Sequence, residues 1–144
     1  MTERMKMSAD EVSAFLDREF PQIHEGGRCF SVESLAPGEA VMRLKAAERH
    51  LRPGGTVSGP TLFTLADLAA YVVILGHIGP VALAVTTGAT INFLAKPEPG
   101  DLLCTCRILK LGRRLIVVEC AIRAEGHPQI VAHATATYSV PTKT

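Results

Sequence analysis

A run of almost uninterrupted apolar residues between positions 62 and 85 constrains the fold of this chain more than any other feature. The run contains a single carboxylate, Asp67, and is broken by the sequence GHIGP. The helical part before Gly76 is shorter than the roughly 20 residues of a membrane span, and an ionised carboxylate in lipid is costly. A helix that is apolar around its whole circumference must instead be covered by protein. The run therefore predicts a buried central helix.

Turn residues and apolar periodicity predict the other elements. Gly59 and Pro60 mark the start of the central helix, because proline fits the first helical turn and lacks only an amide that would be unpaired there. A capping serine and an acid three positions later open a shorter amphipathic helix over residues 8–20. Alternating patterns predict strands over residues 28–35, 39–46, 84–94, 102–110, 114–124 and 127–140.

The order of these elements indicates the fold class. Successive strands joined by short turns favour antiparallel pairing, and the apolar helix has to be wrapped by the sheet. We therefore predict an α+β fold in which one curved antiparallel sheet surrounds one long central helix, with a short N-terminal helix beside it. A chain of 144 residues fits a single domain over residues 1–144.

The cysteines, Cys29, Cys104, Cys106 and Cys120, lack the spacing of a zinc site. We expect no metal, and thiols that stay reduced in the core. If Leu111 and Gly112 form a two-residue hairpin turn, the register of the flanking strands places Cys104 opposite Cys120.

The charge balance argues against several classes of partner. Fifteen basic and 14 acidic side chains give a net charge of +1, which provides no broad basic surface for a nucleic-acid backbone. The first twenty residues are charged and lack an apolar segment of signal-peptide length. We therefore expect a cytoplasmic protein that binds neither nucleic acid nor a membrane.

Short motifs over positions 50–140 resemble those of one family. They are His50, Gly55, Val57 and Gly59, then LAD at 65–67, NFL at 92–94 and PGD at 99–101. In this pattern the chain is similar to the hotdog-fold acyl-CoA thioesterases, specifically the phenylacetate-pathway (PaaI-like) type. It departs from the family pattern at Arg52, Ser58 and Pro60, where asparagine, histidine and glycine are usual.

The residues around Gly59 indicate a site independently of the resemblance. Glycine lets the backbone approach a ligand, and a helix that begins there directs free N–H groups toward an oxyanion. Asp67 follows two helical turns later, about 12 Å along the axis, so a thioester between Gly59 and Asp67 would touch both. Thr64 and Tyr71 share the stripe of Asp67 on the helix. The alternatives are a structural carboxylate held by hydrogen bonds in the core, or one exposed on the single solvent-facing side of the helix.

The resemblance implies further roles. Asp67 would be the nucleophile or the general base, the Gly59 amide would meet the thioester oxygen, and Thr86 would orient water. Thr87 is the alternative to Thr86, and His50 is a candidate acid or base. Candidate substrate-binding residues are Ser58, Pro60 and Thr64, together with cations for the CoA phosphates drawn from Arg49, Arg52, Lys96, Arg113 and Arg114.

The predicted activity is hydrolysis of an acyl-CoA or aryl-CoA thioester to the free acid and CoA, with no cofactor other than the CoA of the substrate. A non-catalytic acyl-CoA sensor is the alternative if the departures at Arg52 and Ser58 abolish chemistry, and a hydratase on the same fold is a weaker one. The strand over residues 84–94 is expected to be a sheet edge that pairs with its two-fold mate. The resemblance implies homodimers with shared active sites, which often form homotetramers.

Overall fold

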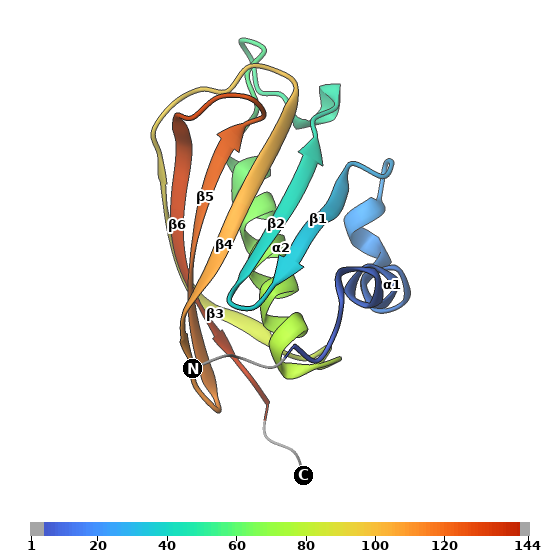
Figure 1. Ribbon diagram of the computed structural model, residues 1–144. Helices are drawn as coiled ribbons and strands as arrows, with labels where there is room; N and C mark the ends of the chain where they lie inside the picture. The colour runs from blue at the N-terminus through green and yellow to red at the C-terminus, as the bar shows by residue number, and fades with distance from the viewer. Residues whose placement is uncertain (1–4, 142–144) are drawn as a thin grey trace.

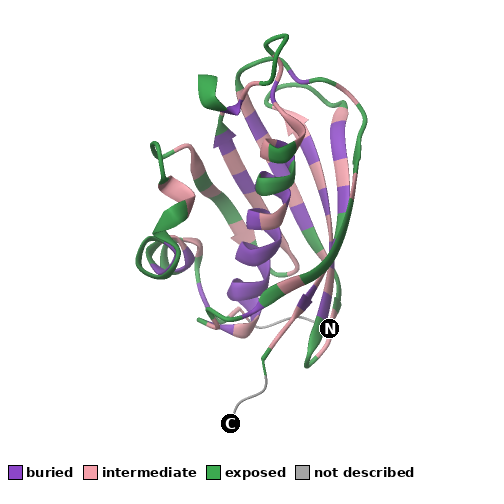
Figure 2. Cartoon of the chain, turned by 180° about the vertical axis from the view of Figure 1, so that it is seen from behind, coloured by how far each residue is buried: buried purple, intermediate pink, exposed green. Residues whose placement is uncertain are grey.

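In the computed structural model, which describes residues 5–141, a six-stranded antiparallel sheet curves around the helix α2 (Gly59–Ile78) (Figures 1 and 2). A shorter helix, α1 (Ala9–Glu19), lies beside β1 and α2. The predicted α+β fold with one central helix is therefore confirmed. The strands are β1 (Phe30–Ala36), β2 (Glu39–Lys45), β3 (Val85–Phe93), β4 (Asp101–Leu111), β5 (Leu115–Ala124) and β6 (Ile130–Ser139), and short 3-10 turns cover Pro21–His24 (η1) and Glu48–His50 (η2).

The strand order in the sheet is β1-β2-β4-β5-β6-β3. The strand β3 therefore lies at an edge, next to β6, as predicted for residues 84–94. The expectation that short turns join all four later strands as hairpin neighbours is wrong for β3 and β4. Residues 94–100 carry the chain from the sheet edge to a position between β2 and β5, and the Val57 N–H donates to Pro97 O at 3.0 Å on this path.

Local chemistry fixes both ends of α2. The Ser58 hydroxyl oxygen accepts a hydrogen bond from the Thr61 N–H at 3.3 Å, and Gly79 ends the helix with φ of 95°. The C-terminal half of the helix is buried, whereas Pro60, Phe63 and Thr64 lie exposed near its start (Figure 2). By length and composition α2 is apolar enough to cross a membrane, but 72% of its most apolar stretch is buried within the protein.

The helix α1 begins with the predicted cap. The Glu11 N–H donates to the Ser8 hydroxyl, and the Glu11 carboxylate accepts from the Ser8 N–H. Val12, Phe15 and Leu16 form the buried face of this helix. Glu19, its last residue, and the cap Phe20 reach the middle of α2, where the Phe20 ring meets the Tyr71 ring edge-on.

The register of β4 and β5 differs from the prediction by two residues. The hairpin loop comprises Gly112, Arg113 and Arg114 rather than a two-residue turn, and a bulge follows Ile108. Cys106 is therefore the residue opposite Cys120, with sulfur atoms 2.9 Å apart, and Cys104 lies opposite Ile122. The predicted pairing of Cys104 with Cys120 is wrong, because the loop and the bulge together shift the partners. All four cysteines are free thiols.

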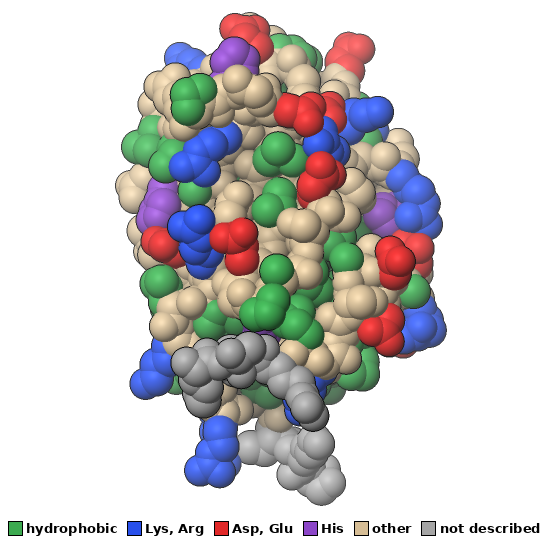
Figure 3. All heavy atoms as spheres, in the orientation of Figure 1, with side chains coloured by type: hydrophobic (Ala, Val, Ile, Leu, Met, Phe, Trp, Pro, Cys, Tyr) green, Lys and Arg blue, Asp and Glu red, His purple; other side chains and the backbone are tan. Residues whose placement is uncertain are grey.

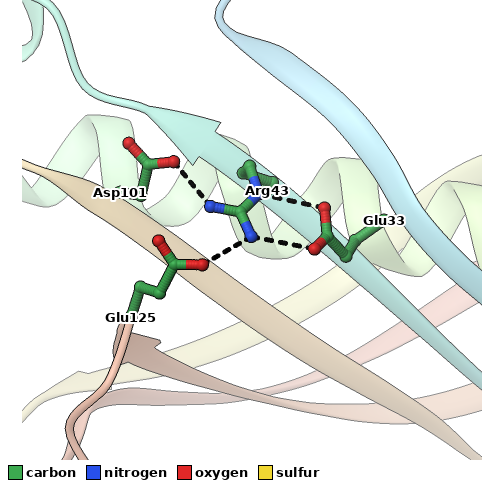
Figure 4. Close-up of polar contacts among 4 residues, drawn as sticks. All are labelled: Glu33, Arg43, Asp101 and Glu125. Atoms are coloured by element: carbon green, nitrogen blue, oxygen red, sulfur yellow. Dashed lines mark hydrogen bonds and ion pairs between the residues drawn. The ribbon is translucent and has the colours of Figure 1, made fainter.

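An arginine on the outer face of the sheet ties several strands together (Figure 4). The Arg43 guanidinium binds Glu33 on β1 at 2.8 Å, Glu125 after β5 at 2.7 Å, and Asp101 at the start of β4. These bonds raise the pKa of Arg43 and lower the pKa values of Glu33 and Glu125. The aspartate of the PGD motif thus has a structural partner. On the face shown in Figure 3, charges of both signs are interspersed.

Two buried histidines make hydrogen bonds that fix their neutral tautomers. His77, near the end of α2, donates from Nδ1 to Val73 O at 2.7 Å, and its Nε2 accepts from the Gly38 N–H at 2.9 Å. His50 accepts at Nδ1 from the Ala47 N–H at 2.8 Å. Burial, and then the nearby charge of Arg49, lower the pKa of His50. His77 therefore connects the β1–β2 turn to α2 by hydrogen bonds. His50 stabilises the η2 turn, which lies before α2 in the sequence.

Replacing His77 should destabilise the fold. In His77→Leu the Gly38 N–H loses its acceptor inside the protein, and the free energy of unfolding should fall by about 2 kcal/mol. The measurement is urea unfolding followed by circular dichroism. His127→Leu, on an exposed turn, is the matched control and should stay within about 0.5 kcal/mol of the native protein. Equal effects of the two changes would contradict the role given to His77.

The lowered pKa of His50 predicts a pH dependence of stability. Below about pH 6.5 the unfolded chain takes up a proton on this histidine before the folded chain does. The contribution of neutral His50 to the free energy of unfolding is therefore complete above about pH 6.5 and is lost as the pH falls toward the folded-state pKa. His50→Gln keeps an acceptor for the Ala47 N–H without titrating, so its unfolding free energy should fall less than that of the native protein between about pH 7 and 5. Parallel pH profiles would contradict this account.

Candidate active site

The carboxylate of Asp67 is held by hydroxyl groups from two strands. The Thr86 hydroxyl on β3 donates to Asp67 Oδ1 at 2.7 Å, and the Tyr138 hydroxyl on β6 lies 2.9 Å from the same oxygen. Tyr138 also lies 3.1 Å from the backbone oxygen of Asp67. Among residues 5–141 no partner bonds the other carboxylate oxygen, Oδ2. Asp67 is therefore anchored through one oxygen and leaves the second available.

Asp67 lines a cavity of about 320 Å³, the Asp67 cavity. This volume lies at the lower end of the range of small-molecule sites, roughly 300 to 1,000 Å³. The Tyr71 ring stacks on the Tyr138 ring, with centroids 6.3 Å apart, and Phe20 meets Tyr71 at 6.2 Å. The complete lining is Glu19, Phe20, Asp67, Leu68, Tyr71, Ala82, Ala84, Val85, Thr86 and Tyr138.

Both tyrosines of this cavity remain protonated hydrogen-bond donors at neutral pH. Burial, and then the Asp67 charge, raise the pKa of Tyr138, and burial raises the pKa of Tyr71. The Tyr71 hydroxyl donates to Ala82 O at 3.0 Å. The two phenol groups are thus already engaged with the protein, and their rings supply an apolar wall.

Gly59 lies in a second cavity of about 330 Å³, the Gly59 cavity. Arg52 and Lys96 line it together with the Phe93 ring, and a Cβ atom on Gly59 would lie 3.3 Å from that ring. The Gly59 N–H lies at the start of α2, at the positive end of the helix dipole, and makes no hydrogen bond within residues 5–141. Two cations and a helix N-terminus in one cavity suit an anionic or carbonyl oxygen.

One chain does not place Gly59 and Asp67 in the same cavity. Eight residues separate them on α2, which corresponds to about 12 Å along the helix and a rotation of about 80°. Gly59 faces Phe93 at the end of β3, whereas Asp67 binds Thr86 near the start of β3. The expectation that one thioester touches both residues is therefore not met within a single chain.

The structure gives several predicted site residues other contacts. Ser58 is the N-cap of α2, and its hydroxyl lies 2.8 Å from that of Thr61. The Thr64 hydroxyl donates to Pro60 O at 3.0 Å, on the exposed side of the helix and outside the Asp67 cavity. Thr87 donates to Thr137 O at 3.2 Å. Of the two candidate threonines, Thr86 is the one that contacts Asp67.

The predicted cations fall into two groups. Arg52 and Lys96 share the Gly59 cavity. Arg49 instead donates to Gly27 O at 3.3 Å. Arg113 and Arg114 lie in the β4–β5 loop, which follows the last residue of the eleven-residue strand β4 and is therefore at the opposite end of that strand from Asp101. His50 lines neither cavity. No group of three or more His, Cys, Asp or Glu side chains within residues 5–141 is arranged to hold a metal ion.

Sequence reasoning singled out Asp67, Tyr71 and Thr86 but missed the other residues of the Asp67 cavity, among them Glu19, Phe20 and Tyr138. One sequence signal could have indicated Tyr138: the alternation of apolar residues in β6 places it on the inward face of the strand. Its contact with Asp67 joins positions 71 residues apart. No local pattern specifies such a pairing.

Comparisons with known proteins agree with this fold. The family model described as "Thioesterase superfamily" matches residues 54–131. A proposed thioesterase from Silicibacter sp. TM1040 is 49% identical, with a TM-score of 0.89 over 99% of this chain and 97% of its own.

Two further solved structures share the fold at lower identity. The protein smu.793 of Streptococcus mutans UA159, bound to acetyl-CoA, is 29% identical, with a TM-score of 0.71 over 79% of this chain and 90% of its own. A mutant of the phenylacetic acid degradation protein PaaI of Thermus thermophilus is 26% identical, with a TM-score of 0.72 over 83% of this chain and 99% of its own. The family match spans more than half of the sequence and includes both Gly59 and Asp67. The chain therefore belongs to the thioesterase superfamily and has its hotdog fold.

Proposed function

We propose that this protein hydrolyses acyl-CoA thioesters and that Asp67 Oδ2 acts as the base or nucleophile. The observation that carries the proposal is the anchoring of Asp67 through Oδ1 alone. Two hydroxyl groups bond this oxygen and so fix the carboxylate, while Oδ2 remains unbonded on a residue that lines a largely apolar cavity. Asp67 is only partly buried, and Oδ2 is not among the buried side-chain atoms that lack a partner, so this oxygen is accessible to a water molecule or a substrate. The acetyl-CoA bound to the Streptococcus mutans relative supports the class of substrate.

The edge strand β3 supports a site that two chains share. Seven of its nine residues are exposed, and Val85 and Phe93 near its two ends are 55% and 51% exposed. Thr86, beside Asp67, lies at its start, and Phe93, beside Gly59, lies at its end. Antiparallel pairing of two such strands about a two-fold axis would bring the start of one strand to the end of the other. The Asp67 cavity of one chain then adjoins the Gly59 cavity of its partner. Association of two such dimers into a homotetramer is part of the same proposal.

In this arrangement the reaction has two possible courses. As a base, Asp67 takes a proton from water while the water oxygen adds to the thioester carbon, and the CoA thiolate leaves with that proton. As a nucleophile, Asp67 forms a mixed anhydride and expels the CoA thiolate, and water then cleaves the anhydride. Gly59 of the partner subunit donates its N–H to the oxyanion in both courses, and Arg52 and Lys96 in the same cavity face the CoA phosphates.

A non-catalytic acyl-CoA sensor is the second candidate, because the family pattern is altered at Arg52 and Ser58. The observations favour the enzyme. Ser58 still caps α2 and keeps Gly59 at the helix start, and Arg52 adds a cation to the Gly59 cavity. Both departures are therefore compatible with the proposed reaction.

Substitution of Asp67 separates enzyme from sensor. Asp67→Asn keeps shape and polarity, so acyl-CoA binding should persist, while turnover should fall by about 100-fold or more. The measurement is release of the CoA thiol from a panel of acyl-CoAs. A near-native rate for the substituted protein would remove Asp67 from the mechanism, and tight binding without thiol release by the native protein would favour the sensor.

Complementation tests the shared site. Asp67→Asn and Gly59→Val should each retain no more than about 1% of the native activity when alone. When the two proteins are refolded together in equal amounts, half of the dimers are mixed, and each mixed dimer contains one site with both native residues. The mixture should therefore recover about a quarter of the native activity. Absence of recovery, with mixed dimers verified by mass, would place Gly59 and Asp67 of each site in one chain.

The two hydroxyl donors to Asp67 should act as a coupled pair. Thr86→Val and Tyr138→Phe each remove one bond to the same oxygen, Oδ1, and should each lower turnover by about 10-fold through misplacement of Oδ2. Because the donors share one acceptor, the double variant should differ from the sum of the singles by at least about 0.5 kcal/mol in activation free energy. Strict additivity in a double-mutant cycle of kcat would contradict joint anchoring.

A further inference from the structure

The N-terminal helix contributes one end of the Asp67 cavity. Glu19, the last residue of α1, and Phe20, its cap, line the cavity together with the residues of α2, β3 and β6. Both precede residue 54, where the match to the thioesterase family begins. This end of the cavity is therefore built from a part of the chain outside the matched domain.

The direction of a bound substrate follows from the proposed function, on which this inference rests. The thioester carbon has to reach Asp67, and the cations that suit the CoA phosphates, Arg52 and Lys96, line the other cavity. The acyl group must then extend away from CoA, within the Asp67 cavity. Glu19 and Phe20 are the lining residues that α1 presents to it.

The charges of the Asp67 cavity are of one sign. Two carboxylates, Asp67 and Glu19, line it, and none of its lining residues is Lys, Arg or His. The ion-pair partner of Glu19 is Arg18, whose side chain is 63% exposed and does not line the cavity. The two phenol hydroxyls are already used, by Ala82 O and by Asp67. An acyl group that ends in a carboxylate would find neither a cation nor a free phenol donor there.

Aromatic rings form much of the remaining wall. Phe20 meets Tyr71 edge-on and Tyr71 stacks on Tyr138, so three rings lie in one row. Leu68 and Val85 complete an apolar surface. A short aliphatic chain or a single aromatic ring gains contact with this wall, whereas an unpaired carboxylate loses hydration without compensation.

We propose that Glu19 and Phe20 select the acyl group: Phe20 favours uncharged apolar acyl chains, and Glu19 repels acyl chains that end in a carboxylate. The substrate class is thus short or aromatic monocarboxylic acyl-CoAs, as distinct from CoA thioesters of dicarboxylic acids. Because Glu19 is 43% exposed on its side chain, solvent screens its effect, and its share of the discrimination is modest.

Three CoA thioesters of equal chain length test the selection: succinyl-CoA, its terminal amide, and 4-methylpentanoyl-CoA, in which an isopropyl group replaces the carboxylate. For the native protein we expect kcat/KM to be highest for the isopropyl compound and at least about 10-fold lower for succinyl-CoA than for the amide. Glu19→Gln should reduce the amide-to-succinyl ratio by about 2- to 5-fold and leave the isopropyl-to-amide ratio unchanged. Phe20→Ala should lower kcat/KM for the isopropyl compound by about 10-fold.

Glu25→Gln is the matched control, since it makes the same change in net charge at an exposed residue that does not line the cavity. It should leave all three ratios as in the native protein. Equal kcat/KM for succinyl-CoA and the amide, or equal effects of Glu19→Gln and Glu25→Gln, would overturn the proposal. Hydrolysis of other acyl-CoAs but of none of these three would also overturn the selection. If the native protein hydrolyses no acyl-CoA of the panel, the proposed function fails, and the same ratios of Kd from calorimetry then decide the selectivity by the same criteria.

Discussion

The bonds from Thr86 and Tyr138 to one oxygen of Asp67 are the interaction on which the site depends. Most residues of the helix α2 are buried, so a carboxylate on it is costly unless donors meet it. β3 and β6 supply those donors because they pair with each other and place Thr86 opposite Tyr138. The same two bonds hold the helix to the sheet edge and orient Oδ2. Fold stability and the proposed chemistry therefore share one set of atoms.

The incomplete site of the single chain follows from the geometry of that helix. Gly59 and Asp67 both belong to α2, but their separation turns them toward different ends of β3. An edge strand that is largely exposed on the described structure is an unfavourable end point for a sheet, since its N–H and C=O groups can pair with another chain. Pairing of two such edges would remove the exposed strand and complete the site in one step. In this account, assembly and catalysis are consequences of the same edge.

Much of this architecture could be predicted from the sequence because the signals were local. The capping pair Ser8 and Glu11, the Gly59–Pro60 helix start and the period-two strands depend on residues a few positions apart. The partner of Cys120 could not be predicted, because a bulge after Ile108 changes the register without a recognisable sequence signal. Tyr138 and Phe20 were missed for a related reason: they meet Asp67 and Tyr71 only when distant segments pack. The departure at Ser58, by contrast, has a simple local explanation as the cap of α2.

A crystal structure of the Asp67→Asn protein with an acyl-CoA bound tests the central claim most directly, because it shows which chain supplies each contact. The account predicts a dimer joined through β3, in which the thioester carbonyl oxygen accepts from the Gly59 N–H of one subunit while its carbon faces position 67 of the other. The acyl chain should lie against Phe20, and the CoA phosphates should lie near Arg52 and Lys96. A thioester that contacts Gly59 and position 67 of the same chain, or that binds outside both cavities, would contradict it.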